Sequence, residues 1–254
     1  MTNLLFELSQ YHVYRKPFVI CIVTKAIGST PRKAGSKMLV FEDGSIKGTI
    51  GGGSVELQAK KDAQMVMHQR EPKVIDYQLE EDLAMQCGGN MTIYFEPIFP
   101  AEKLYVFGAG HVGREVGFYA QTLGFNVTYI DHRPDIYKEF DAGNAECLVG
   151  NYVEVIDKLS LNNDSYAVIV TPNHSFDEEV LGKLAMKDLK YLGMMGSKRK
   201  VLEVSKRLQE ENKLTKEHLD KVDMPIGIPL KVETPREIAI SIVAKITDVR
   251  NSNY

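Results

Sequence analysis

Cysteine, long apolar runs and an excess of positive charge are all scarce in this sequence, and each scarcity excludes a class of protein. The 254 residues include three cysteines, an odd number without the spacing of a zinc site. The longest apolar runs, such as 18–23 and 166–170, are far too short to span a bilayer. A net charge of −3 offers no electrostatic basis for binding nucleic acid or an anionic membrane.

The amino-terminal segment lacks a basic start followed by an uninterrupted apolar stretch, so we expect no secretory signal. The cysteine usage fits a reducing compartment, and the expected location is therefore cytoplasmic. Hydrophobic residues at 44% and charged residues at 26% are typical of a soluble globular protein with one large or two modest domains.

The pattern of apolar residues changes near residue 100, where Pro97 and Pro100 indicate a linker. The first part mixes strands with two helices, predicted over 3–14 and 55–70. From Leu104 onward strands and helices alternate, which predicts a parallel sheet covered by helices on both faces. We therefore expect an α/β protein, in which a smaller N-terminal α/β domain (1–100) precedes a C-terminal Rossmann-type, doubly wound domain (101–254).

The sharpest local motif follows the predicted strand at 104–107. Gly108, Gly110 and Gly113 form GxGxxG at the opening of a helix, and Asp131 ends the next strand. The first glycine allows a tight turn, the second lets backbone approach a pyrophosphate, and the third lets helix and strand pack closely. A helix start offers N–H groups and a positive partial charge to phosphates. The motif predicts a phosphate-bearing ligand.

Two residues beside this motif have more than one interpretation. His111 is a candidate contact for a phosphate or another part of the ligand, but an exposed histidine at a helix start explains it equally well. Asp131, followed by His132 and Arg133, leaves open whether a ribose 2′-hydroxyl or a 2′-phosphate is recognised.

Two glycine-rich loops stand out in the first part of the chain. Gly51, Gly52 and Gly53 precede Ser54, and consecutive glycines usually allow backbone to come close to something, often an anion at a helix start. Ser54 is then an N-cap or a hydroxyl ligand; the alternative is a tight turn with an ordinary cap. We expect this loop to converge with the second loop and the pair to face the Rossmann carboxyl edge.

The second loop contains Cys87, beside Gly88 and Gly89. Cys21 and Cys147 lie in apolar runs and are interpreted as core, whereas a thiol in a glycine-flanked loop can be accessible and reactive. A nucleophile, a ligand for soft metal or sulfur, and an unremarkable buried thiol all remain open for Cys87. We expect no metal site.

Further candidate loops lie where a doubly wound sheet binds ligands. His174 with Asp177 forms either an acid–base pair or a helix cap with its neighbour. Ser197, Lys198 and Arg199 open a helix and either hold an anion or form a solvated face. Thr234, Pro235 and Glu237 form a capping box that needs no functional interpretation.

Six sequence motifs of this chain resemble those of the XdhC/CoxI family, in the same order. They are GSTPRKAGSKMLV…GTIGGGSVE, CGG before MTIYFEP, LYVFGAGHVG…VTYID, TPNHSFDEEVL, YLGMMGSKRK and MPIGIPLKVETPREIAISI. These are accessory proteins of xanthine and carbon monoxide dehydrogenases. The resemblance implies a maturation factor, a cofactor chaperone more than a catalyst. Such a factor binds molybdenum cofactor (molybdopterin), supports its sulfuration and inserts it into an apo molybdenum hydroxylase of the xanthine dehydrogenase type.

The resemblance also implies site residues and partners. Many relatives carry cysteine where this chain has Ser54, so a thiol role does not transfer there, whereas Cys87 matches the family's second glycine-flanked cysteine. We expect Cys87 to handle sulfur, a homodimer to form, and a cysteine desulfurase to be a candidate partner. An NAD(P)-dependent oxidoreductase using His174 as acid–base group is the alternative, and a scaffold that docks a hydroxylase without touching cofactor is a third.

Overall fold

The computed structural model describes residues 16–80, 88–211 and 213–252. The chain divides into two compact units, one ending at Pro100 and the other beginning at Ala101. The helix expected over 3–14 and the candidate Cys87 both lie outside the described residues.

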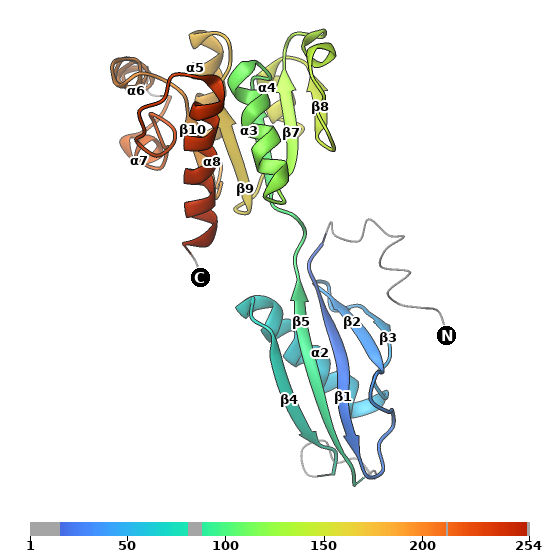
Figure 1. Ribbon diagram of the computed structural model, residues 1–254. Coiled ribbons are helices and arrows are strands. Elements are labelled where there is room, and N and C mark those ends of the chain that lie inside the picture. Colours follow the sequence, from blue (N-terminus) through green and yellow to red (C-terminus); the bar gives the residue numbers. More distant parts are fainter. Residues whose placement is uncertain (1–15, 81–87, 212, 253–254) are drawn as a thin grey trace. The chain divides into compact units, whose positions relative to one another are not determined.

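The described residues of the amino-terminal unit form a five-stranded antiparallel sheet with one helix across a face (Figure 1). Its strands lie in the order β3-β2-β1-β5-β4, so β1, with Phe18 opposite Phe41 of β2 and Ile98 of β5, is central. The elements are β1 (Phe18–Ile27), β2 (Lys37–Phe41), β3 (Ile46–Gly48), α2 (Gly53–Gln69), β4 (Lys73–Gln78) and β5 (Asn90–Ile98).

The core of this unit follows from two periodicities. Alternate residues of β1, such as Val19 and Cys21, point to one face of the sheet and are fully buried. On α2 the residues at helical spacing, Val55, Ala59 and Ala63, are buried against that face. Cys21 is therefore a core residue, as its apolar surroundings predict.

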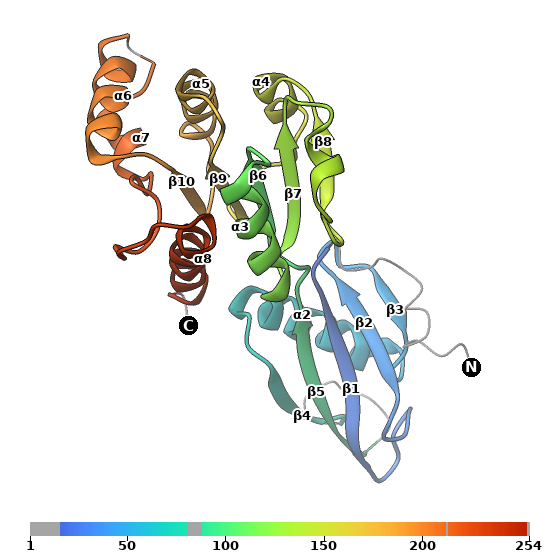
Figure 2. The same cartoon turned by 45° about the horizontal axis from the view of Figure 1, so that its top comes forward.

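The carboxyl-terminal unit is a five-stranded parallel sheet in the order β10-β9-β6-β7-β8, with helices on both faces (Figure 2). This confirms the doubly wound Rossmann-type sheet. Its elements are β6 (Lys103–Phe107), α3 (His111–Thr122), β7 (Asn126–Asp131), η1 (Ile136–Glu139), β8 (Glu146–Val149), α4 (Tyr152–Ile156), β9 (Ser165–Ile169), α5 (His174–Leu184), β10 (Tyr191–Met194), α6 (Lys198–Glu210), α7 (Lys216–Asp220) and α8 (Pro235–Asn251).

Alternate side chains of β6 build the two layers of core. Leu104 and Val106 pack with residues of α3 and α8 on one face, whereas Tyr105 and Phe107 pack with residues of α4, α5 and α6 on the other. Every residue of β6 from Leu104 to Phe107 is buried, which is why this part of the strand is apolar, as a central parallel strand requires.

One expectation about the core needs correction. The apolar run around Cys147 predicts a core thiol, but Cys147 is only half-buried, because β8 is the edge strand of the sheet. The predicted capping box at the start of α8 is confirmed, since the Thr234 hydroxyl accepts from the Glu237 N–H and the Glu237 carboxylate accepts from the Thr234 N–H.

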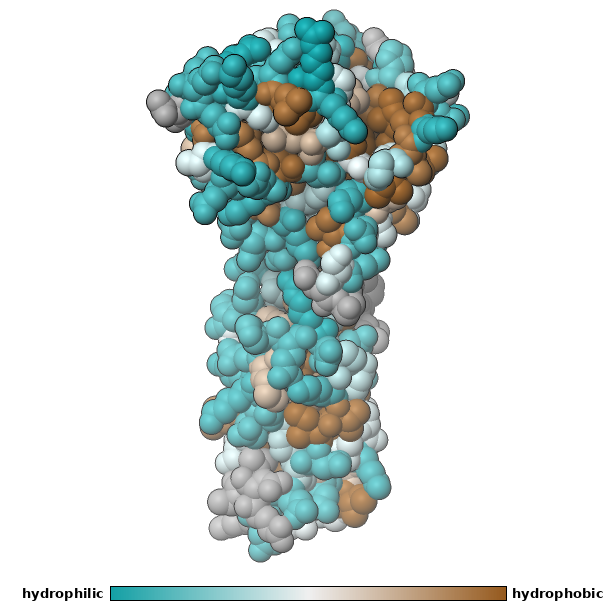
Figure 3. All heavy atoms as spheres, turned by 90° about the vertical axis from the view of Figure 1, so that its left-hand side faces the viewer, coloured by the Kyte–Doolittle hydropathy of each residue, from teal (hydrophilic) through white to brown (hydrophobic). Residues whose placement is uncertain are grey.

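The surface carries apolar side chains among hydrophilic ones. Exposed examples in the carboxyl-terminal unit are Phe118 on α3, Leu202 on α6 and Ile240 on α8. On the face drawn in Figure 3 the apolar residues gather in separate patches, each bordered by hydrophilic residues. Within the described part of the chain, no helix has the length and apolar character needed to cross a membrane.

Candidate functional site

The glycine turn lies at the carboxyl edge of the parallel sheet, beside the point where the strand order reverses. The crossover from β6 through α3 leads to β7, whereas that from β9 through α5 leads to β10 on the other side of the sheet. The loops that follow β6 and β9 are thus neighbours at the topological switch point, where open α/β sheets bind ligands.

Each glycine of the turn meets a different spatial demand. Gly108 has φ +106°, and a Cβ there would overlap the carbonyl of Val170, so the loops after β6 and β9 touch backbone to backbone. A Cβ at Gly113 would overlap the carbonyl oxygen of Gly108. At Gly110 the nearest atom to a Cβ is Arg133 Nη2 at 3.9 Å, so this side of the turn admits close approach. The contacts of Gly108 and Gly113 agree with the steric roles predicted from the sequence, and the role of Gly110 toward a pyrophosphate stays a prediction.

The start of α3 carries no negative charge of its own. Its N-cap is Gly110, which has no capping side chain, and its first turn contains no acidic residue. No acid in the first turn of the helix therefore offsets the positive partial charge at its start, and the carboxylate that lies nearby, Asp131, is paired with Arg133. His111 is the first helical residue and is exposed, which is compatible with both of its interpretations.

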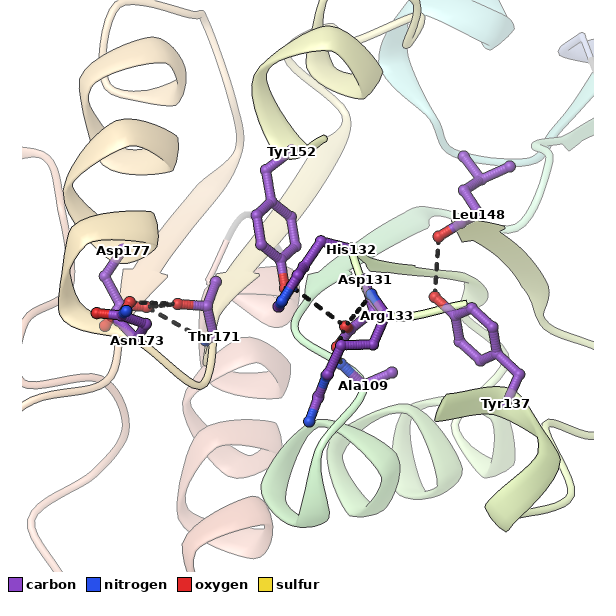
Figure 4. Close-up of polar contacts among 10 residues, drawn as sticks. All are labelled: Ala109, Asp131, His132, Arg133, Tyr137, Leu148, Tyr152, Thr171, Asn173 and Asp177. Carbon is purple, nitrogen blue, oxygen red and sulfur yellow. Dashed lines mark hydrogen bonds and ion pairs between the residues drawn. The ribbon is translucent and has the colours of Figure 1, made fainter. Parts of the chain in front are cut away.

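Asp131 lies beside the turn, as predicted, and its carboxylate is fully engaged (Figure 4). Oδ2 accepts from the Ala109 N–H at 2.8 Å and from Arg133 Nη2 at 2.8 Å. Oδ1 accepts from the Arg133 N–H at 3.0 Å and from Arg133 Nε at 2.9 Å. Burial alone would raise the pKa of Asp131, but the hydrogen bonds from Arg133 and Ala109 lower it below its ordinary value. Asp131 therefore remains a carboxylate.

An aromatic cluster lies next to this carboxylate. His132 Nδ1 is 3.5 Å from Asp131 Oδ1 and 3.3 Å from the Tyr152 hydroxyl, and its ring lies 4.7 Å from that of Phe176. Burial raises the pKa of Tyr152, which keeps the phenol protonated. The cluster joins β7, α4 and α5 at the carboxyl edge.

A buried ion pair connects the loops after β9 and β10. Asp177 accepts from the Thr171 hydroxyl at 2.6 Å and from Lys200 Nζ at 2.5 Å, and Lys200 also donates to the carbonyl of Met195 at 3.1 Å. The His174 ring nitrogen lies 3.8 Å from Asp177, and its side chain is 78% exposed. Asn173, not His174, caps α5. Asp177 thus organises the loops and makes no hydrogen bond that orients His174.

The triple-glycine loop forms a ring of donors, and the chain itself supplies the anion. Glu56 Oε1 accepts from the Thr49 hydroxyl at 2.5 Å and from the N–H groups of Ile50, Gly51 and Gly52 at 3.1, 3.3 and 2.9 Å. Burial tends to raise the pKa of Glu56, but these hydrogen bonds lower it overall. The loop does gather around a negative charge, and that charge is the carboxylate of α2.

Ser54 lies beyond this ring, as the second residue of α2, and is exposed. The interpretation of Ser54 as N-cap is wrong, because α2 begins at Gly53 and Gly52 is its N-cap. Its role as a hydroxyl ligand stays a prediction. A hollow of about 310 Å³ adjoins the start of α2 and is lined by Gly44, Ile46, Gly53, Glu56, Leu57 and Lys60.

The two glycine-rich loops of this unit lie against one segment, 28–31. A Cβ at Gly89 would overlap the carbonyl of Ser29, and a Cβ at Gly51 would come within 2.6 Å of Pro31 Cγ. The described parts of both loops thus contact the same segment, and the expectation that the two loops converge with each other stays a prediction. The further expectation, that the cluster faces the Rossmann edge, stays a prediction.

Sequence reasoning did not single out Glu56, Lys200 or the pairing of Arg133 with Asp131. The available signal was weak in each case: a glutamate four residues after Gly52, and cations within three residues of Ser197 and Asp131. Across the described residues, no group of three or more histidine, cysteine, aspartate or glutamate side chains could hold a metal ion.

Comparison with known proteins decides the family. The sequence model of the XdhC Rossmann domain matches residues 104–246, and that of the XdhC and CoxI family matches residues 14–78. The chain belongs to the XdhC and CoxI family. A crystal structure described as a xanthine dehydrogenase of Bacillus halodurans shares the fold, with TM-score 0.54 and 24% identity over 99% of this chain and 96% of that one.

The curated relatives of this chain differ from one another in the share of their length that the chain covers. An uncharacterized Escherichia coli protein, YqeB, is 31% identical over 98% of this chain and 47% of its own length. A Bacillus subtilis protein described as a probable xanthine dehydrogenase subunit is 28% identical over 63% of this chain and 46% of its length. The chain thus spans about half the length of these two relatives. The E. coli molybdenum cofactor insertion chaperone PaoD is 25% identical over 92% of this chain and 84% of its length.

Proposed function

We propose that this protein is an accessory factor that binds molybdenum cofactor and inserts it into a molybdenum hydroxylase of the xanthine dehydrogenase type. The observation that carries the proposal is the open glycine turn at the carboxyl edge of a sheet that the XdhC Rossmann model matches. The likeness to PaoD, a chaperone named for this activity, supports it along most of the chain.

The residues at the turn fit the phosphate of such a cofactor. Molybdopterin carries a phosphate, and its dinucleotide forms carry a pyrophosphate. Gly110 leaves room for such a group, and the start of α3, whose first turn contains no acidic residue, supplies N–H donors and positive partial charge. The triple-glycine loop fits a phosphate less well, because Glu56 already accepts from its N–H groups. When bound, the cofactor carries the molybdenum; this chain's part is to hold its phosphate.

We also propose that Cys87 takes part in sulfuration, with a cysteine desulfurase as the sulfur donor. The support is chemical and comes from the other two cysteines. Burial raises the pKa of the Cys21 thiol to about 12, and burial also raises the pKa of Cys147. Sulfur transfer needs a thiolate, which both of these sites disfavour. We further propose that the protein acts as a homodimer in the cytoplasm.

The test is reconstitution of an apo molybdenum hydroxylase. Wild-type protein is expected to retain molybdenum cofactor through gel filtration and to activate the hydroxylase. The Cys87→Ser variant should retain cofactor but activate poorly, and sulfide added under reducing conditions should restore activity. Cys147→Ser, a matched change at a half-buried thiol, should behave like wild type.

Two results would contradict parts of this proposal. Full activation by Cys87→Ser removes the thiol from the mechanism, and failure of wild-type protein to retain cofactor removes the carrier role.

The alternative function, an NAD(P)-dependent oxidoreductase, uses the same edge of the sheet and His174 as its acid–base group. The structure offers that role little support, because His174 is exposed and Asp177 is engaged by Lys200.

A further inference from the structure

The acid that ends β7 has no acceptor site left for a ribose. In a dinucleotide-binding Rossmann domain this acid accepts a hydrogen bond from a ribose hydroxyl. A carboxylate has about four lone-pair sites. Here Asp131 is fully buried, and four donors occupy it: the Ala109 N–H, the Arg133 N–H, and Nε and Nη2 of Arg133. A ribose hydroxyl would have to displace one of these donors.

Arg133 is held at the place where a ligand would meet the turn. Its Nη2 lies 3.9 Å from the position of a Cβ on Gly110, the glycine that admits close approach. Its two-pronged contact with Asp131 sets the plane of the guanidinium, and 38% of its side chain is exposed (Figure 4). A guanidinium is a planar fork of donors that matches phosphate oxygens.

We propose that Asp131 is a positioning residue and that Arg133 is the residue that contacts the ligand, so that this turn selects a phosphate monoester and not a ribose diol. The inference deepens the proposed function, because it rests on a phosphate-bearing ligand at this edge. A phosphate monoester occurs both on the pterin of molybdenum cofactor and at the 2′ position of NADP. The experiment separates these two sources.

The test uses the full chain and two pairs of probes that differ by one phosphate. The first pair is NADP⁺ and NAD⁺. The second is the fluorescent oxidised pterin obtained from molybdopterin, before and after removal of its phosphate by a phosphatase. Affinities are measured by titration calorimetry or fluorescence for wild type, Arg133→Ala, Arg133→Lys and Asp131→Asn. Arg250→Ala is the matched control, since Arg250 lies near Glu102, before β6, at the opposite edge of the sheet.

In wild type and in Arg250→Ala, the phosphorylated member of at least one pair should bind about tenfold tighter or more, the effect of a hydrogen-bonded charge pair. Arg133→Ala should remove the preference, and Arg133→Lys should keep part of it. Asp131→Asn should lower the ratio of the two affinities within a pair, because Arg133 loses the carboxylate that positions it. A direct contact between Asp131 and ribose would instead weaken NADP⁺ and NAD⁺ equally and leave the pterin pair unaffected.

The proposal is overturned if neither pair shows a phosphate preference, if the preference survives in Arg133→Ala, or if Asp131→Asn leaves the ratio unchanged. Circular dichroism checks each variant, and the two Arg133 variants decide the outcome if Asp131→Asn does not fold. A preference confined to NADP⁺, in protein that retains no molybdenum cofactor, contradicts the proposed function but leaves this inference standing.

Discussion

Replacing Glu56 by alanine is expected to open an anion site that the native chain closes. One oxygen of this carboxylate accepts from the Thr49 hydroxyl and from three consecutive N–H groups, those of Ile50, Gly51 and Gly52. The variant removes the acceptor but leaves the positive φ angles of the glycines, and with them the ring of donors. Such rings of backbone N–H groups bind anions in other proteins.

The magnitude follows from the exposure of the site. A hydrogen bond to a charged group contributes about 1.5–3 kcal/mol when buried. Glu56 is only partly buried, so solvent screens its charge and hydrates the N–H groups once the acceptor is gone. We expect Glu56→Ala to lower the free energy of unfolding by about 1–2 kcal/mol, the size of a lost helix cap.

The sign of the pH dependence follows from the lowered pKa of Glu56. Its hydrogen bonds hold the pKa below the ordinary value of 4.5 against the effect of burial. The stabilising contribution of the carboxylate is therefore fully present above that value and is lost as pH falls through the folded-state pKa. The stability difference between wild type and Glu56→Gln should be largest near pH 7 and shrink toward acidic pH.

Hydrogen–deuterium exchange of the peptide covering residues 49–56, with and without phosphate, separates this site from the Rossmann turn. Phosphate should protect this peptide in Glu56→Ala and not in wild type. At ten times its Kd, phosphate should stabilise the variant by about 1.4 kcal/mol. The exposed glutamate Glu42 provides the control Glu42→Ala. Equal protection of the wild-type peptide would refute the idea that Glu56 closes the loop.

Three further experiments test other parts of the structure. Lys200→Met leaves the buried carboxylate of Asp177 without its cation, so denaturant unfolding should show a loss of about 3 kcal/mol, and Lys200→Arg should lose less. Gly108→Ala places a Cβ against a backbone carbonyl at φ +106° and should lower the free energy of unfolding by more than about 2 kcal/mol. Gly182 has open space around it in helix α5, so Gly182→Ala should leave the free energy of unfolding unchanged or raise it by up to about 1 kcal/mol. Cys21, with its pKa raised to about 12, should resist iodoacetamide at pH 8 in folded protein and react on unfolding, as mass spectrometry of the labelled peptide would show.

Much of the carboxyl-terminal unit could be predicted from local patterns. The order of a strand, GxGxxG, a helix, a second strand and Asp131 has few structural solutions, because Gly108 and Gly113 each meet a steric demand that a β–turn–helix corner creates. Alternation of apolar strands and helices likewise predicts a parallel sheet covered on both faces, since both faces must be buried.

Other features could not be predicted, because they depend on which side chains the fold brings together. Three glycines before a helix indicate an anion, but the sequence pattern is the same whether the anion is a ligand or Glu56. Lys200 stands among other cations, and only the packing of α6 beside α5 shows that this one is buried against Asp177.

The contrast is sharpest at Asp131. The sequence by itself placed this acid at the end of a strand beside the glycine turn, because strand length and crossover geometry set the spacing between the two motifs. Only the tertiary structure decided how its carboxylate is used. Arg133, two residues along the chain, turns back and donates to the Asp131 carboxylate, and the Ala109 N–H donates to it as well. All of the acceptor sites of this carboxylate are therefore occupied by donors from the protein. Hydrogen bonds are short-ranged and directional, so a spacing in sequence indicates which groups can meet, and the folded backbone determines which of them do.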